Sequence, residues 1–344
     1  MKYPFQFKID FITRLIVLCC LFIGSTTYAQ QGVLDNGGEG QFPFQLTTNL
    51  VGAGNSLDFD GVDDLVRTPS SSSLNSYENS GTLTIEFWLN PDSLFGTQDW
   101  ISKISSSNDS GFVIRSSGSN LLCSLRMGTS WVTASLTLIE GEWQHVAFVA
   151  QNGLGLHAYW NGGYQGTSSS TQNMLVSNLS MQLGGSVFGN HANGQLDELR
   201  FWSADLDSTT LRDWMTIRID FNHPNVFELI AYYHFDEGDS RSNSTLPDLT
   251  GNNDGSLVNM DTFLAWVSSG ANLGESSEYT FGGTSLAYYL SDGAMITVDN
   301  FSTTPSAIFI YSTFTSPSGT IFPSSFDSTN IDEYFGVKTV GGGT

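Results

Sequence analysis

The chain has 344 residues, of which 13% are charged, and its acidic side chains outnumber the basic ones by 34 to 12, which gives a net charge of −22. Nucleic acids and anionic membranes are bound by clustered cations, so this charge balance excludes both as main partners. Charged residues make up roughly 25% of an average domain, and here Ser, Thr, Asn and Gly take their place. An acidic surface of this kind favours solubility and divalent cations.

Residues 1–29 have the pattern of a secretory signal peptide. Three basic residues come first, an apolar run over residues 15–23 follows, and the sequence Thr-Tyr-Ala at 27–29 provides a cleavage site. The apolar run is shorter than the about 20 residues that cross a bilayer, which makes a permanent membrane anchor the less favoured alternative. We predict that this segment is removed and that the mature protein is secreted or held at the cell surface, with no membrane span.

The exported part has an unusual balance of charge and cysteine. The signal segment holds three of the 12 basic residues and one of the 34 acidic ones, so nine basic and 33 acidic side chains remain. A single cysteine, Cys123, also remains, which excludes an intrachain disulfide. The stability of the exported chain must therefore come from a large core or from a bound metal. About 315 residues are enough for one large sandwich and part of a second domain.

Apolar and polar residues alternate in short runs along the exported part, and this alternation predicts strands. The runs cover residues 82–89, 121–127, 144–149, 154–160 and 195–202. Clusters of Gly, Asn, Ser and Asp between the runs supply turn positions. A helix is predicted over residues 208–217, with Asp207 or Ser208 as its N-cap, and a last strand over residues 229–235. The pattern as a whole predicts an all-β antiparallel sandwich.

Composition divides the chain into four parts. The signal segment is followed by a Gly-rich lead-in over residues 30–44, and the sandwich is predicted over residues 45–268. Residues 272–344 form a second β-rich unit that does not repeat the first. Because the sequence ends shortly after a strand-like run over residues 334–340, we interpret this unit as a domain cut short, in a natural protein that is longer.

Four short segments in a fixed order carry the strongest motif signal. They read SLDFDGVDD at 56–64, LTIEFWLNP at 83–91, GEWQHVA at 141–147 and GQLDELRFW at 194–202. Together they resemble the secreted laminin G-like branch of the concanavalin A-like jelly rolls. The resemblance implies an antiparallel jelly-roll β-sandwich, followed here by a partial second β-rich domain. The four segments are specific for the fold and much less specific for the ligand.

The resemblance also implies a function, because this fold is used mainly for adhesion and sugar binding. We expect a binding module that recognises a glycan or a surface protein, as one part of a larger adhesin or polysaccharide-utilisation protein of the Bacteroidetes type. Two alternatives stay open. One is a glycoside hydrolase or polysaccharide lyase on the same fold, and the other is a structural spacer domain.

Acidic residues suggest a metal site at one strand end, where Asp60, Asp63 and Asp64 flank Gly61 in a predicted tight turn. Calcium takes about six to eight oxygen ligands, and such a turn supplies several at once. Members of the resembling family often hold calcium near these segments, so we expect a structural calcium ion, with Asp197 as a more distant ligand. The alternative is that Asp60 and Asp64 only accept hydrogen bonds from turn amides.

Aromatic residues fall into two groups. Those within the four segments lie at strand positions, where core packing is expected. Those next to polar loops are candidates for stacking on the apolar face of a sugar ring, with nearby polar side chains bonding its hydroxyls. The predicted ligand-binding residues are Trp131, Tyr159, Trp160, Asn161, Tyr164 and His191, with Trp100, Gln165 and Asn190 as further candidates. The alternative for each is an ordinary loop residue.

Catalysis is not predicted, because the carboxylates have the wrong spacing. A retaining glycosidase needs two carboxylates about 5–5.5 Å apart, which on a strand requires residues i and i+2 on one face. Asp197 and Glu198 are adjacent, so we expect them to face opposite sides, and Glu86 stands alone on its strand. The Glu-x-Asp-x-x-Glu run of the enzyme relatives is absent from the sequence, and the five histidines lack zinc-like spacing.

Overall fold

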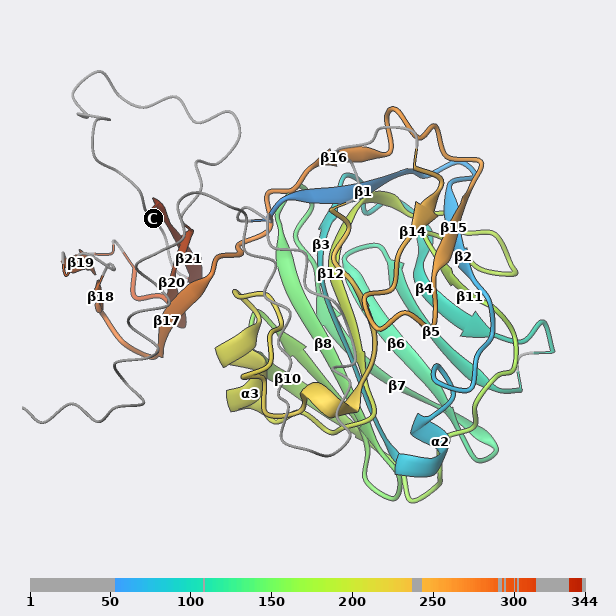
Figure 1. Cartoon of the computed structure of the whole chain (residues 1–344). Helices are drawn as coiled ribbons and strands as arrows, with labels where there is room; N and C mark the ends of the chain where they lie inside the picture. The colour runs from blue at the N-terminus through green and yellow to red at the C-terminus, as the bar shows by residue number, and fades with distance from the viewer. Residues whose placement is uncertain are drawn as a thin grey trace, which may run out of the picture.

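The computed structural model describes residues 53–107, 109–236, 243–289, 293, 295–299, 301, 303–313 and 334–341. The predicted signal segment and Gly-rich lead-in lie outside these residues. Two eight-stranded antiparallel sheets stack as the layers of a sandwich (Figure 1). This arrangement confirms the predicted all-β antiparallel jelly roll, and further β-structure follows it in the chain.

One layer, called here the β3 sheet, is built from strands that are distant in sequence. Its order is β10-β9-β8-β3-β12-β1-β16, and β13 pairs with β12 beside this path. The strands are β1 (Asn55–Asp60), β3 (Thr82–Pro91), β8 (Gln144–Gln151), β9 (Gly155–Trp160), β10 (Gly163–Ser169), β12 (Asn193–Trp202), β13 (Leu229–Tyr233) and β16 (Trp266–Ser268). All four sequence segments therefore meet on adjacent strands, since β8, β3, β12 and β1 follow one another in this sheet.

The opposite layer, called the β5 sheet, has the order β14-β15-β2-β11-β4-β5-β6-β7. Its strands are β2 (Leu65–Thr68), β4 (Thr97–Ile104), β5 (Gly111–Ser117), β6 (Asn120–Met127), β7 (Ser130–Thr137), β11 (Met181–Leu183), β14 (Thr245–Leu246) and β15 (Gly255–Val258). Strands β5, β6 and β7 are joined by two-residue connections that contain Gly118 and Gly128.

Alternation along the strands divides their residues between the core and the outer faces. In β6, Leu121, Cys123 and Leu125 are buried between the sheets, whereas the residues between them are half-buried on the outer face. In β7, Val132 faces the core and its neighbour Trp131 lies on the outer face. The outer face of the β5 sheet is therefore the place where polar and aromatic side chains meet solvent.

Helices are short and few among the described residues: α2 (Tyr77–Ser80), α3 (Ser208–Trp214) and the 3₁₀ turn η1 (Val226–Glu228). None of the helices described is long and apolar enough to cross a membrane. The Asp207 side chain caps α3 by accepting a hydrogen bond from Thr210 N at 2.7 Å. The predicted helix is confirmed at its start, but it ends three residues early, because Arg200 bonds the carbonyl oxygens of Trp214 and Ile217.

Four of the five aromatic residues predicted to pack in the core are buried, on both sides of the β3 sheet; Trp143 precedes β8 and is half-buried. Phe87 and Phe201 belong to the core between the two sheets. Trp88 and Trp202 point to the outer side and are fully buried there, Trp202 in a second apolar cluster with Leu211 of α3. The central strands β3 and β12 are therefore covered on both faces, whereas the edge strand β10 stays largely exposed.

A small C-terminal unit follows the sandwich. It consists of a sheet of β17 (Ser276–Phe281), β20 (Ala307–Thr313) and β21 (Tyr334–Val340) and a hairpin of β18 (Leu286–Tyr289) and β19 (Met295–Val298). The sheet packs on the sandwich through Met215, which is fully buried against Phe309 and Val340. Thr216 Oγ1 donates to Ser277 Oγ at 2.6 Å, and Lys338 Nζ donates to Trp143 O at 2.9 Å.

Candidate functional site

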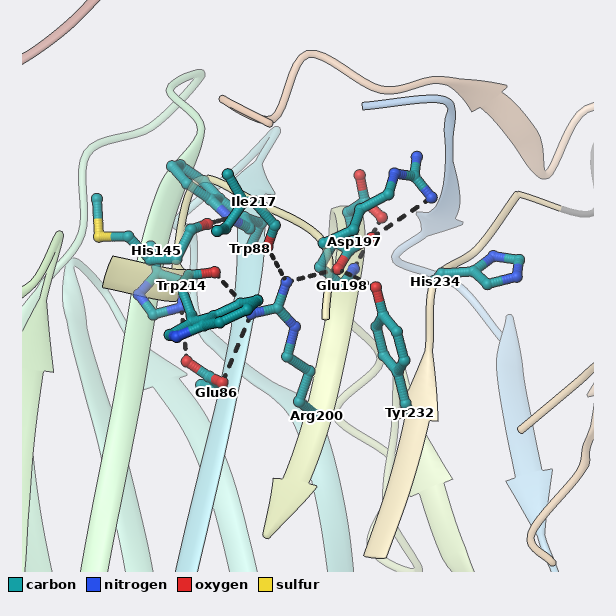
Figure 2. Close-up of polar contacts among 12 residues, drawn as sticks. Glu86, Trp88, His145, Asp197, Glu198, Arg200, Trp214, Ile217, Tyr232 and His234 are labelled. Atoms are coloured by element: carbon teal, nitrogen blue, oxygen red, sulfur yellow. Dashed lines mark hydrogen bonds and ion pairs between the residues drawn. The ribbon is translucent and has the colours of Figure 1, made fainter. Parts of the chain in front are cut away.

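A cluster of ionisable side chains is buried on the outer side of the β3 sheet (Figure 2). Arg200 Nη2 lies 2.7 Å from Glu198 Oε2, and His145 Nε2 lies 3.2 Å from Glu86 Oε2. The Tyr232 hydroxyl donates a hydrogen bond to Glu198 Oε2 at 2.6 Å. Each of these five side chains is at most 2% exposed. The cluster is therefore a buried ionic network rather than part of the surface.

Burial and charge act against each other in this network. Burial opposes the ionisation of Glu86, but the hydrogen bond to His145 and the charge of Arg200 outweigh it and lower the pKa of Glu86 to about 2. Burial lowers the pKa of His145, which favours the neutral ring. Burial, with the negative charges of Glu198 and Asp236, raises the pKa of Asp197 well above its ordinary range. Glu86 is thus held as a carboxylate, while burial and the neighbouring negative charges favour the neutral form of Asp197.

A β-bulge places two of these acids on the same side of β12. The register with β3 shifts between Asp197 and Arg200, and Glu198 has a φ of +50°. Leu196 and Leu199 both pack in the core between the sheets, so the two acids between them both lie outside that core. The expectation that Asp197 and Glu198 face opposite sides is wrong, because the bulge breaks the alternation on which it rested.

The network joins β12 to the segment after α3. Arg200 donates to the carbonyl oxygens of Trp214 at 2.9 Å and Ile217 at 2.8 Å, and Arg218 Nη1 lies 2.6 Å from Asp236 Oδ2. Because its carboxylates are covered, a polysaccharide in solution does not reach them in this structure. The geometry of the network therefore indicates a structural role, which is to hold β12 to the segment that follows α3.

The register of the β5 sheet sets a different group of side chains on its outer face. Val113 of β5 lies opposite Ser124 of β6, and in the adjacent row Arg126 of β6 lies opposite Trp131 of β7. Arg115 lies two residues after Val113 in β5, on the side of the Val113–Ser124 pair that is opposite to Arg126. Rows are about 7 Å apart, because each spans two residues of a strand. The two arginines therefore lie on either side of the Val113–Ser124 row.

A hollow of about 450 Å³ opens on this face, which is within the size range of about 300–1,000 Å³ of small-molecule sites. Its lining residues are Ile104, Ser106, Val113, Arg115, Ser124, Trp131, Phe188 and Asn190. Phe188, from the loop between β11 and β12, is 49% exposed, and Trp131 is half-buried. Two aromatic rings from distant parts of the chain thus border one hollow.

The polar groups of the hollow are held by one buried acid. Asp99 is fully buried and pairs with Arg115 through two contacts, of which Nη2 to Oδ2 measures 2.9 Å. The Asn190 side chain donates to the same Asp99 Oδ2 at 3.2 Å, and Asp99 N donates to Asn190 O at 2.6 Å. A fixed pair of donors beside aromatic rings is pre-organised for a polar ligand, because little side-chain freedom is lost on binding.

Comparison with known proteins agrees with this architecture. Residues 60–211 match the family described as the concanavalin A-like lectin/glucanases superfamily, under a laminin G-like model. Residues 60–211 belong to this superfamily. No curated protein matches the chain.

Solved structures resemble the chain at low identity. A candidate carbohydrate-binding protein from Bacteroides ovatus is 16% identical with a TM-score of 0.46; the match covers 60% of this chain and 58% of that protein. A heptameric SAP-like pentraxin from Limulus polyphemus is 18% identical with a TM-score of 0.37, covering 47% and 81% of the two chains. The CBM40 module of the Ruminococcus gnavus IT-sialidase, bound to α2,3-sialyllactose, is 14% identical with a TM-score of 0.38, covering 47% and 97%. Likeness at this level leaves the ligand of this chain open.

In the concanavalin A-like domain, the predicted ligand residues lie in more than one place. Trp131 lines the hollow, and so does the further candidate Asn190. Sequence reasoning missed Phe188, Arg115 and Asp99. The one signal for Phe188 was its position in the loop sequence Gly-Ser-Val-Phe-Gly, where an apolar residue has no strand to pack in.

Four of the predicted residues lie instead on the β9–β10 hairpin of the β3 sheet. Trp160 packs against the core and the C-terminal unit, and its Nε1 donates to Gln144 Oε1 at 3.0 Å. Asn161 is 3% exposed with a φ of +46°, and its Oδ1 accepts from His145 N at 2.9 Å. Tyr159 and Tyr164 pack edge to face with ring centroids 5.6 Å apart. The polar groups of Trp160 and Asn161 are thus already used within the domain.

The remaining candidates have mixed positions. Trp100 is fully buried in the core, where its Nε1 donates to Ser116 Oγ. His191 follows Asn190, but its Nδ1 lies 3.4 Å from Asp64 O, beside the acidic turn rather than in the hollow.

The acidic turn brings three of the four predicted calcium ligands together. Asp60, Asp63 and Asp64 offer carboxylate oxygens that all lie within 4.8 Å of one another. Asp60 Oδ1 accepts from Val62 N at 2.8 Å, and Asp64 Oδ2 accepts from Asp60 N at 3.1 Å, as the alternative interpretation expects. One oxygen of each of these two groups stays outside those turn bonds, so the donor set still fits calcium in part.

Asp197 is not part of this group. Asp60 pairs with Asn193 of β12, and Asp197 lies four residues further along that strand, about 13 Å away. Its carboxylate bonds Ser269 Oγ at 2.5 Å inside the protein. A calcium ion at the turn would need other oxygens to complete its coordination.

Proposed function

We propose that the concanavalin A-like domain binds carbohydrate through the hollow on the outer face of the β5 sheet. The observation that carries this proposal is that Trp131 and Phe188 border one hollow in which Asp99 holds Arg115 and Asn190 in fixed positions. Sugar rings present an apolar C–H face that stacks on aromatic side chains, and their hydroxyls bond to nearby donors. The superfamily, whose description names lectins, is consistent with this assignment.

The surroundings of Trp131 favour an extended glycan over a single sugar. Trp131 also borders a second hollow, of about 640 Å³. Leu154 and residues 168–172, which include the end of β10 and the segment after it, line this hollow too. A chain of several sugars would extend across the indole from one hollow into the other. Leu154 is 55% exposed and offers further apolar contact there.

Binding without cleavage is the form of the function that we propose. Three carboxylates have a strongly displaced pKa. Glu86 and Asp197 are covered by protein, whereas Asp58, whose pKa burial and neighbouring acids raise to about 6, is half-buried; none of the three lines the hollow. The N-terminal signal pattern and the low content of basic residues support a secreted or cell-surface location. In that setting the domain would attach a larger adhesin or polysaccharide-utilisation protein to its glycan.

A glycan array with the mature chain tests the proposal. We expect Trp131→Ala and Phe188→Ala each to weaken binding at least about tenfold, because each removes a stacking surface. Phe95→Ala is the matched control, since Phe95 is a loop phenylalanine that is 91% exposed and does not line the hollow; its affinity should stay within about twofold. Equal melting temperatures would show that the variants fold.

Two results would contradict the proposal. One is a wild-type chain that binds no glycan, and the other is unchanged glycan affinity in both Trp131→Ala and Phe188→Ala. If a reducing-sugar assay shows that the chain cleaves a polysaccharide, its function is hydrolysis and not binding alone. If the chain binds a surface protein and no glycan, its function is protein recognition.

A further inference from the structure

The three strands that form the floor and one wall of the hollow have a distinctive charge composition. Strands β5, β6 and β7 contain two arginines, Arg115 and Arg126, and no Asp or Glu. The whole chain has 34 acidic and only 12 basic residues. These three strands thus carry basic side chains and no acidic ones, on a protein that is acidic as a whole.

The two arginines differ in how their charge is compensated. The buried Asp99 neutralises Arg115 through two contacts. Arg126 has no hydrogen-bond or ion-pair partner among the residues that the structure describes, and its Nε is buried without a partner. Among the eight Lys and Arg side chains that the structure describes, only one other, Arg67, makes no hydrogen bond or ion pair. Arg67 is exposed on β2.

Arg126 is placed next to the stacking platform. Its Cζ lies 5.8 Å from the centre of the Trp131 ring, and the two residues are directly opposite on β6 and β7. The cation–π contact holds the guanidinium beside the indole. A half-buried guanidinium gains most from an anion that offers two oxygens, because its planar fork donates two parallel hydrogen bonds.

We propose that the Trp131 site is selective for an acidic polysaccharide. Arg126, which lies beside the hollow and not in its lining, would bind the carboxylate or sulfate of a sugar residue next to the one stacked on Trp131. This inference rests on the proposed function, because it names the class of glycan that the same hollow binds. The anion would supply the partner that Arg126 lacks, and Asp99 would keep Arg115 available for hydroxyl groups.

Two matched pairs of polymers test the inference by affinity electrophoresis of the mature chain. Polygalacturonate is compared with its fully methyl-esterified form, and dextran sulfate with dextran, so that each pair differs only in charge. We expect the wild type to bind the acidic member of at least one pair about tenfold or more tightly than its neutral counterpart. A preference in the first pair assigns a carboxylate, and a preference in the second assigns a sulfate. The preference should fall as NaCl rises, since salt screens the attraction.

Arg126→Gln is the decisive variant, and Arg67→Gln is its control. Both substitutions remove one positive charge from the outer face of the β5 sheet. Arg126 contacts the Trp131 ring, whereas Arg67 lies on β2, four strands away from β6. We expect Arg126→Gln to lose the preference for the acidic polymer while the affinity for the neutral one stays within about twofold. Arg67→Gln should keep the preference.

The outcomes separate this inference from the proposed function. Equal wild-type affinity for the acidic and neutral members of both pairs overturns the inference alone. An equal loss of both affinities in Arg126→Gln also overturns it, because Arg126 would then only support Trp131. If the wild type binds none of the four polymers, the inference fails, and the glycan array decides the proposed function. If neither Trp131→Ala nor Phe188→Ala changes any affinity, both the inference and the proposed function fail.

Discussion

Replacement of Arg200 by Met should unfold the sandwich at a much lower urea concentration. Arg200 is 1% exposed, lies 2.7 Å from Glu198 and 3.6 Å from Glu86, and bonds two carbonyl oxygens after α3. Loss of one partner of a buried ion pair costs about 3–5 kcal/mol, because the other charge stays buried without compensation. Here two carboxylates lose their cation at once, so we expect the free energy of unfolding to fall by at least about 4 kcal/mol.

Urea unfolding followed by tryptophan fluorescence measures this loss. At about 2–4 °C per kcal/mol for a domain of this size, the melting temperature should fall by roughly 8–16 °C. Arg67→Met, on the exposed side of β2, is the control and should change the stability by no more than about 0.5 kcal/mol. The double variant Glu198→Gln with Arg200→Met should recover part of the loss, because one unpaired charge is removed.

A free energy of unfolding for Arg200→Met that lies within about 1 kcal/mol of the wild-type value would refute the reasoning. It would mean that the two carboxylates do not depend on the guanidinium in the folded protein. If Arg200→Met loses the expected stability and the double variant recovers none of it, the loss comes instead from the hydrogen bonds with the carbonyl oxygens of Trp214 and Ile217.

Three further predictions concern acid, calcium and the single thiol. The pKa of Glu86 is lowered from 4.5 to about 2 in the folded protein, so its contribution to stability is present above about pH 4.5 and is lost as the pH falls through about 2; Glu86→Gln should flatten this part of a pH–stability curve, and an unchanged slope would contradict the shift. Millimolar Ca²⁺ should raise the melting temperature relative to a chelator, and Asp63→Asn should remove the increase while the exposed control Asp205→Asn keeps it; identical curves for the wild type with and without calcium would reject the site. Cys123 is 2% exposed and burial raises the pKa of its thiol, so a thiol reagent should label it only after unfolding, and rapid labelling of the native chain would disprove its burial.

The strands were predictable because their cause is local. The alternation in residues 82–89 and 195–202 appears in the structure as β3 and β12, each extended by two residues. Trp131 became a candidate for a different reason, its place next to a polar loop, and no strand was predicted over β7. In the structure its neighbour Val132 faces the core, so period two puts Trp131 on the opposite face. Local periodicity thus predicted the two strands, but not the faces of Asp197 and Glu198, where the bulge in β12 breaks the alternation.

The polar part of the site could not be predicted, because its cause is tertiary. Asp99 joins Arg115 and Asn190, and the last of these is 91 residues away from it along the chain. The bulge at Glu198 was equally hidden, since nothing in the run Leu-Asp-Glu-Leu marks an extra residue in the register with β3. The covering of Trp160 depends on how residues after 272 pack against the sandwich, which no local pattern indicates.

The most direct test of the account is a crystal structure of the mature chain with a bound oligosaccharide taken from the polymer with the highest affinity. The account predicts a sugar ring stacked on the Trp131 indole in the hollow that Phe188 and Asn190 border, with any acidic group next to Arg126. A ligand bound at the β9–β10 hairpin or at the turn of Asp60, with an empty hollow on the β5 sheet, would contradict it.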